Sequence, residues 1–100
     1  EAVVRLLLGA GANLEAACDE DQLTHLHLAA REGHEVVVQC LLDVNANIKA
    51  QDHKQWTPLH WAADKGHEQA VRRLLSSKAN LEAKSNKWET PLHLAAKNGH

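Results

Sequence analysis

A seven-residue segment occurs three times in this chain at a constant spacing. The copies are THLHLAA at residues 24–30, TPLHWAA at 57–63 and TPLHLAA at 90–96, each 33 residues after the last. A fixed period between about 20 and 50 residues is typical of stacked repeats, in which each unit buries its apolar face against its neighbours. The spacing therefore predicts a repeat array built from one short structural unit.

Each copy of the segment predicts the start of a helix. Threonine at its first position is a favourable N-cap residue. Proline at the second suits the first helical position, which His25 takes in the first copy. Apolar residues three and four apart follow, and Gly-His pairs at 33–34, 66–67 and 99–100 are placed to end the helix.

Second helices are predicted from a repeated apolar stripe at residues 3–8, 37–42 and 70–75, expected to be one buried face. The alternating segments 12–16, 46–50 and 79–83 follow, and then polar turns. Gly11, Asn45 and Lys78 occupy the left-handed position after each second helix, where a lysine is strained by roughly 1 kcal/mol. These patterns predict an all-α chain of antiparallel helix pairs with projecting, β-hairpin-like turns.

This 33-residue unit resembles the ankyrin repeat over the whole chain. The resemblance implies an ankyrin-repeat solenoid forming one array, with a partial repeat at 1–13, complete repeats at 14–46 and 47–79, and a partial repeat at 80–100. Gln22, Gln55 and Trp88 stand where the family usually has a glycine in the projecting turn. Both ends of the array should expose apolar faces, which predicts marginal stability or end-to-end self-association.

Eight histidines raise the question of a metal site. His27, His60 and His93 lie three residues after a capping threonine, where an imidazole can hydrogen-bond back to the cap. His27 and His34 are about 10 Å apart along a helix, too far to share an ion bound at about 2 Å. We interpret the histidines as structural. No catalytic arrangement or phosphate loop is found, which predicts a chain that is not an enzyme and has no cofactor.

Composition narrows the class of partner. The formal charge of −2 disfavours a general nucleic-acid binder. No apolar run approaches the roughly 18 residues of a membrane span. Cys18 and Cys40 fit no metal spacing and favour reduced thiols in a cytoplasmic or nuclear protein.

Resemblance to ankyrin repeats implies recognition of a protein partner through the turn tips and the concave face of the first helices. Trp61 replaces a helix leucine and is predicted to pack internally, whereas Trp56 and Trp88 in the turns suit partner binding and packing equally. Carried over by position, the candidates are Leu23, Arg31, Glu32, His53, Lys54, Trp56, Asp64, Lys65, Asn86, Lys87, Trp88, Glu89, Lys97 and Asn98.

Charge is distributed unevenly along the chain. Residues 1–50 hold eight acidic and three basic side chains, and residues 51–100 hold five acidic and eight basic ones. An elongated partner would then place its basic end near residues 19–21. Two other readings stay open: a structural spacer within a longer array, or an engineered ankyrin scaffold, neither with a binding role of its own.

Overall fold

The computed structural model describes residues 2–11 and 21–100, which form six helices and no strand. This agrees with the all-α prediction. The predictions made for segment 12–16, for Cys18 and for the first acidic tip at 19–20 fall outside the described residues. The helices are α1 (Ala2–Gly9), α2 (His25–Glu32), α3 (Glu35–Asp43), α4 (Pro58–Lys65), α5 (Glu68–Ser76) and α6 (Pro91–Lys97).

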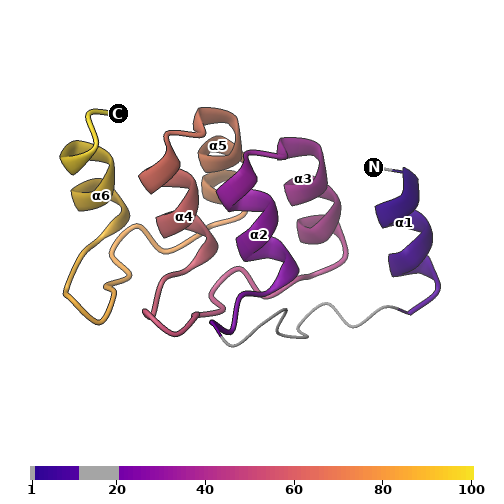
Figure 1. Cartoon of the computed structure of the whole chain (residues 1–100). Helices are drawn as coiled ribbons and strands as arrows, with labels where there is room; N and C mark the ends of the chain where they lie inside the picture. The colour runs from indigo at the N-terminus through magenta and orange to yellow at the C-terminus, as the bar shows by residue number, and fades with distance from the viewer. Residues whose placement is uncertain (1, 12–20) are drawn as a thin grey trace.

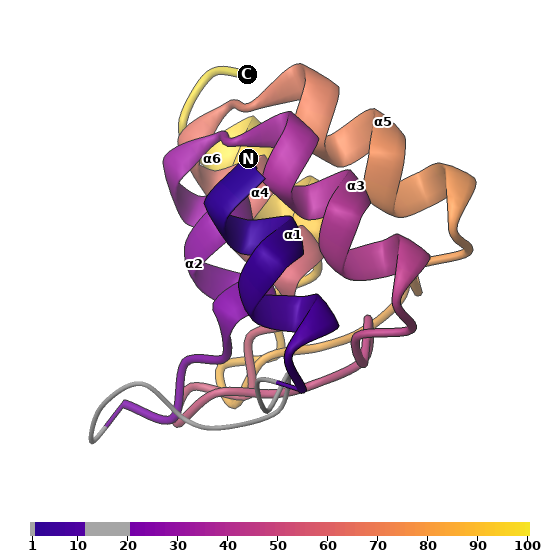
Figure 2. The same cartoon turned by 90° about the vertical axis from the view of Figure 1, so that its right-hand side faces the viewer.

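The helices are arranged in two rows (Figure 1). In the first-helix row, α2 packs on α4 and α4 packs on α6. In the second-helix row, α1 contacts α3, and α3 packs on α5. Each second helix also packs against its own first helix, as the pairs α2–α3 and α4–α5 show. The loops that precede the first helices project together below both rows (Figure 2).

The three first helices begin with the same cap. In each, the threonine hydroxyl accepts a hydrogen bond from the backbone N–H of the histidine three residues on, and the histidine ring bonds back to the threonine backbone N–H. This is a capping box in which histidine takes the part usually played by glutamate. Helices α2 and α4 then end at Gly33 and Gly66, whose φ angles are 73° and 72°. The predicted helix bounds and caps are confirmed at these positions.

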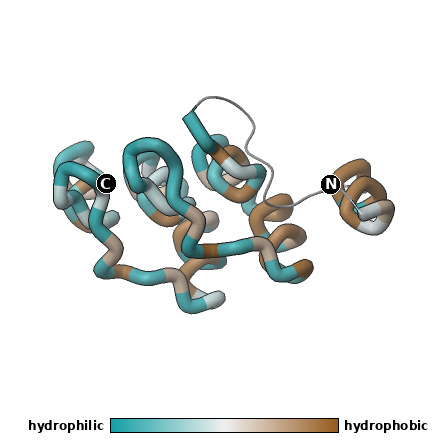
Figure 3. The backbone as a smooth tube through the Cα atoms, turned by 90° about the horizontal axis from the view of Figure 1, so that it is seen from below, coloured by the Kyte–Doolittle hydropathy of each residue, from teal (hydrophilic) through white to brown (hydrophobic). Residues whose placement is uncertain are grey.

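The core lies where the two rows meet. Leu26, Leu59 and Leu74 are each at most 1% exposed, and Val38 is fully buried beside them. Alanines on the first helices let α2, α4 and α6 approach closely, because a methyl group takes little space between helix axes. Figure 3 shows the apolar residues gathered in the helices and the polar ones in the loops.

Two predicted buried faces are exposed at the ends of the rows. On α1, Val3 is 66% and Leu7 57% exposed, and no residue of this helix is buried. Leu92 on α6 is 77% exposed, whereas its counterparts Leu26 and Leu59 are buried. The stripe alone wrongly predicted burial here, because burial needs a helix on each side, whereas the prediction that both ends of the array expose apolar faces is confirmed. Among the described residues, α1 contacts α3 of the second-helix row, and a pocket separates it from α2. At the other end, Leu92 lines an open groove beside α5.

The left-handed positions predicted after the second helices are confirmed. Gly11, Asn45 and Lys78 have φ of 93°, 66° and 68°. At Lys78 the backbone N–H donates to the Leu75 carbonyl oxygen at 2.9 Å, which closes the end of α5. A side chain with a Cβ atom costs about 1–2 kcal/mol in this conformation, so Lys78 is retained at the expense of stability.

We expect Lys78→Gly to raise the free energy of unfolding by about 0.5–1 kcal/mol. Relief of the left-handed strain exceeds the extra entropy that glycine gives to the unfolded chain. Urea denaturation followed by circular dichroism measures the shift in midpoint. The adjacent Ser77 has φ of −95° and carries no such strain. Ser77→Gly should therefore lower the midpoint, and a gain equal to that of Lys78→Gly would refute this account.

Candidate protein-interaction surface

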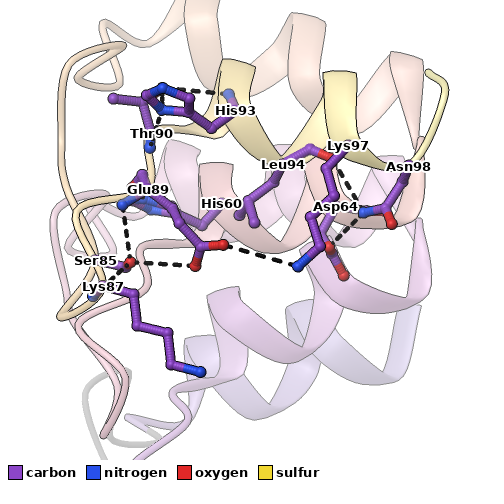
Figure 4. A network of polar contacts seen from close by, with 10 residues as sticks. All are labelled: His60, Asp64, Ser85, Lys87, Glu89, Thr90, His93, Leu94, Lys97 and Asn98. Atoms are coloured by element: carbon purple, nitrogen blue, oxygen red, sulfur yellow. Dashed lines mark hydrogen bonds and ion pairs between the residues drawn. The ribbon is translucent and has the colours of Figure 1, made fainter.

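The projecting loops are built on two superposable five-residue hairpins, 52–56 and 85–89. The first residue of each closes the hairpin: Asp52 N–H donates to the Trp56 carbonyl oxygen at 3.0 Å, and Ser85 N–H to the Glu89 carbonyl oxygen at 2.9 Å. The side chain of the same residue accepts two further backbone N–H groups. Figure 4 shows these bonds around Ser85. The loops are thus held by internal hydrogen bonds although they carry no regular strand.

Gln55 and Trp88, the fourth residues of the two hairpins, have left-handed backbone, and so does Gln22, which stands 33 residues before Gln55. Gln22, Gln55 and Trp88 have φ of 64°, 59° and 64°. At these three positions the ankyrin family usually has a glycine. The left-handed backbone observed here is the conformation that glycine favours. This chain therefore has a residue other than glycine at each turn, and the backbone there is still left-handed.

Backbone hydrogen bonds join neighbouring tips into a row. His53 N–H donates to the Asp21 carbonyl oxygen at 3.0 Å, and Asn86 N–H donates to the Lys54 carbonyl oxygen at 3.0 Å. The His53 ring adds a second bond from Nδ1 to the same Asp21 oxygen, also at 3.0 Å. Because each tip is fastened to the one before it, the exposed side chains of 21–22, 53–55 and 86–88 keep fixed relative positions.

His27 and His60 fasten each first helix to the next loop. His27 Nε2 lies 2.8 Å from the Trp56 carbonyl oxygen, and His60 Nε2 lies 2.9 Å from the Glu89 carbonyl oxygen. A carbonyl only accepts, so Nε2 carries the proton, and Nδ1 must then accept from Thr57 N–H at 3.0 Å. Burial of the His60 ring lowers its pKa below the ordinary 6.5. The predicted cap is confirmed, and the bond between repeats is an additional role.

A second set of histidines packs against glycines of the preceding unit. A Cβ atom added to Gly33 would lie 2.7 Å from His67 Nδ1, and one added to Gly66 would lie 2.6 Å from the His100 ring. His67 Nε2 also bonds the Arg31 carbonyl oxygen at 3.0 Å. His67 thus bonds a carbonyl oxygen in the last turn of α2, in the preceding unit. No group of three or more potential metal ligands is found among the described residues.

Trp61 lies at the centre of a cluster that combines two aromatic rings, two cations and a carboxylate. Its ring centroid is 4.5 Å from that of Trp56, and its Nε1–H donates to Asp52 Oδ2 at 2.8 Å. Arg31 and Lys54 lie over the ring at 5.9 and 5.7 Å from its centroid. These distances permit cation–π attraction. Trp61 is therefore half-buried, packs on Trp56 and Asp52 of its own repeat, and reaches the preceding repeat through Arg31.

Two of the candidate contact residues lie in the interior. Leu23 is 2% and Trp56 8% exposed. Each stands immediately before a capping threonine, and an apolar residue there turns inward to pack against the helix. Trp88 stands one residue earlier relative to its threonine and is 74% exposed. This one-residue displacement, visible in the sequence, decides that Trp56 packs and Trp88 projects.

The other candidates lie at the surface, on the loops or on the first-helix row. Several are paired: Arg31 with Glu32 at 3.0 Å, Lys65 with Asp64 at 3.8 Å, and Lys97 with Glu89 at 3.9 Å. Asn98 Nδ2 donates to Asp64 Oδ1 at 2.6 Å, a contact that links α6 to α4 (Figure 4). Exposed are Glu32, His53, Lys54, Lys65, Asn86, Lys87, Trp88, Lys97 and Asn98, and half-buried are Arg31, Asp64 and Glu89.

Sequence reasoning missed Asp52 as an organiser of this surface. Asp52 is 4% exposed and bonds Lys54 N–H, Trp56 N–H and the Trp61 indole. The repeat period could have identified Asp52, because it stands 33 residues before Ser85 and begins the same kind of hairpin. An acid two and four residues ahead of exposed backbone N–H groups is a common turn former.

The match to a known family covers most of this surface. Residues 1–85 match the family described as ankyrin repeats (3 copies). Members of this family are generally protein–protein interaction modules without catalytic activity. No helix of the described residues is long and apolar enough to cross a membrane. The capped first helices, the hydrogen-bonded tips and this match, which extends over more than half of the sequence, together show that the chain belongs to the ankyrin repeat family.

Proposed function

We propose that this chain is a solenoid segment that binds a protein partner through its turn tips and the concave face of its first-helix row. The proposal includes a cytoplasmic or nuclear location, supported by the sparing use of cysteine. The observation that carries it is the row of fastened tips. Three successive loops present exposed side chains whose spacing is fixed by backbone hydrogen bonds from one tip to the next. A surface fixed in advance loses little entropy when a partner binds.

Charge adds an orientation to the proposal. The later tips expose Lys54 and Lys87, whereas Asp21 is exposed on the first. A partner whose acidic end lies against the lysines and whose basic end lies toward residues 19–21 would be attracted along the row. Such attraction weakens with salt, because the screening length falls from about 10 Å at 0.1 M to about 3 Å at 1 M.

Peptides selected from a random library on the immobilised chain provide a test. A selected peptide is titrated by calorimetry against wild type, against a charge-reversed surface variant, Lys65→Glu with Lys97→Glu, and against Arg72→Glu. Arg72 is exposed on α5 in the second-helix row. We expect the surface variant to bind about tenfold more weakly and Arg72→Glu within about twofold. A library that yields no peptide above a blank surface, or equal losses in both variants, would favour the spacer reading.

A second proposal concerns self-association. Val3, Leu6 and Leu7 of α1 form an exposed apolar stripe. A groove beside α5 and α6 is lined by the apolar residues Val71, Leu75, Leu81 and Leu92. We propose that α1 of a second copy occupies this groove, because α1 has the apolar pattern of the helices that pack against α5 in the second-helix row.

Because this contact joins two different surfaces, it leaves a free α1 and a free groove at the ends of every assembly, and it predicts a mass that rises with concentration. Sedimentation of the wild-type chain should show association that Leu92→Glu removes, since a charge in an apolar contact costs more than the contact gains. Val44→Glu places the same change on another exposed apolar residue, 42% exposed at the end of α3, and should leave association unchanged. A wild-type chain that remains monomeric at millimolar concentration would contradict the proposal.

A further inference from the structure

Trp88 combines two features that folding does not favour. It is 74% exposed, whereas Trp56 is 8% exposed and Trp61 is half-buried. Its backbone is left-handed at φ 64°, a conformation in which a Cβ atom is strained. A large aromatic side chain at such a position gains little from burial and opposes the local backbone. Strain combined with exposure points to a role in binding.

The surroundings of Trp88 are basic. Lys84 Nζ lies over the indole, 5.5 Å from the ring centroid, and Lys87 precedes Trp88 in the same tip. The nearby acid, Glu89, is turned toward Lys97 Nζ at 3.9 Å and Ser85 Oγ at 3.4 Å. Figure 4 shows the Lys87 side chain extending away from this network. The tip therefore presents an apolar ring next to two lysines, while its carboxylate is occupied elsewhere.

The backbone of Trp88 is held in a defined place. Trp88 N–H donates to the Ser85 carbonyl oxygen at 2.9 Å, and Asn86 N–H fastens the tip to the Lys54 carbonyl oxygen of the preceding loop. A tryptophan on a rigid loop loses little freedom when it enters a pocket. Aromatic anchors of this kind dominate the energetics of protein interfaces.

We propose that Trp88, Lys84 and Lys87 form the anchor of the interaction surface and bind a partner segment that carries acidic side chains beside an apolar one. The indole would contact the apolar side chain, and the lysines would pair with the acids. This inference rests on the proposed protein-binding function and names the partner's chemistry. A protein segment is favoured over an anionic bilayer because Asp21 lies in the same row of tips and the whole chain has a formal charge of −2.

The test uses peptides selected on the wild-type chain, measured by calorimetry against Trp88→Gly and Gln55→Gly. Gln55 occupies the equivalent position of the preceding tip, with φ 59°. Both variants should melt at a higher temperature than wild type, because both relieve left-handed strain. We expect Trp88→Gly to bind about tenfold or more weakly, as for loss of an interface anchor, and Gln55→Gly to bind like wild type. Lost binding in a more stable protein cannot come from unfolding.

Charge is tested with a double variant, Lys84→Glu with Lys87→Glu. Its control, Lys49→Glu with Arg72→Glu, reverses two exposed cations away from the tip. Selected peptides should be rich in acidic residues. They should lose affinity for Lys84→Glu with Lys87→Glu and keep it for Lys49→Glu with Arg72→Glu. Peptides that bind Trp88→Gly normally but fail on Lys65→Glu with Lys97→Glu would overturn the anchor and leave the proposed function intact. Failure to select any peptide would count against both.

A membrane partner is the remaining outcome. The same variants are sedimented with vesicles of phosphatidylcholine and phosphatidylserine. We expect no binding of the wild-type chain to these vesicles. Binding to vesicles that Trp88→Gly abolishes would overturn the assignment of a protein segment as the partner.

Discussion

Replacing His60 with alanine is expected to lower the free energy of unfolding by about 3–5 kcal/mol. The ring is fully buried and joins Thr57 N–H to the Glu89 carbonyl oxygen. Its removal leaves Thr57 N–H without a partner, at about 1–3 kcal/mol. The Glu89 carbonyl oxygen loses one of its two hydrogen bonds and keeps the one from Ser85 N–H, and a cavity adds to the cost. A loss of this size is a large part of the stability of a small domain, about 5–15 kcal/mol.

His93 provides the matched control. It makes the same cap contacts with Thr90, at 3.0 Å from Thr90 N–H to Nδ1, but its side chain is exposed. His93→Ala should therefore cost only about 1 kcal/mol, the usual worth of a cap. Urea denaturation of the two variants measures the difference. Equal losses would show that the bond from His60 to the next loop adds nothing to the cap.

The same histidine predicts a dependence of stability on pH. Burial lowers the pKa of His60 below its ordinary 6.5, so the unfolded chain binds the proton more readily than the folded one. The stabilisation is fully present above pH 6.5 and is lost as the pH falls through the lower pKa of the folded state. Thermal melts of wild type from pH 7.5 downward should show a loss that is smaller in His60→Gln. Identical pH profiles would contradict this assignment.

Much of the fold could be predicted because each repeat encodes its own local geometry. The threonine caps, the glycines that end the first helices and the left-handed sites at Asn45 and Lys78 depend on residues close in sequence. Trp88 is the clearest case, because its register with Gln22 and Gln55 predicts the turn position from the sequence. Local backbone conformation follows from local sequence, and the period shows which positions are equivalent.

Contacts between repeats were harder to predict. The period aligns His60 with His27 but does not show that each ring reaches the carbonyl oxygen of a loop 29 residues later. Leu23 was carried over as a contact candidate by its position in the repeat, and Trp56 suited packing and partner binding equally. Their position before the cap turns both inward. On α1 and α6, the apolar faces predict burial, but burial depends on neighbouring helices that a single repeat does not specify.

Asp52→Ala is expected to lower the free energy of unfolding by about 2–4 kcal/mol. The carboxylate is 4% exposed and accepts hydrogen bonds from Lys54 N–H and Trp56 N–H at 2.9 Å and from Trp61 Nε1–H at 2.8 Å. Hydrogen bonds to a charged group contribute about 1.5–3 kcal/mol each, and part of that is recovered when water reaches the opened loop. The change should also release Trp61, which raises its exposure to solvent.

Ser85 is a neutral residue at the hairpin position equivalent to Asp52, so comparing their variants separates the effect of the charge from that of the hairpin shape. Ser85 Oγ accepts the equivalent bonds from Lys87 N–H at 3.1 Å and Glu89 N–H at 3.2 Å but contacts no indole. Ser85→Ala should thus cost only about 1 kcal/mol, and Asp52→Asn, which keeps the shape, should fall between the two alanine variants. Urea denaturation followed by tryptophan fluorescence measures all three. If Asp52→Ala lost no more than Ser85→Ala, the bond to Trp61 would be energetically neutral, and the central cluster would depend on ring packing alone.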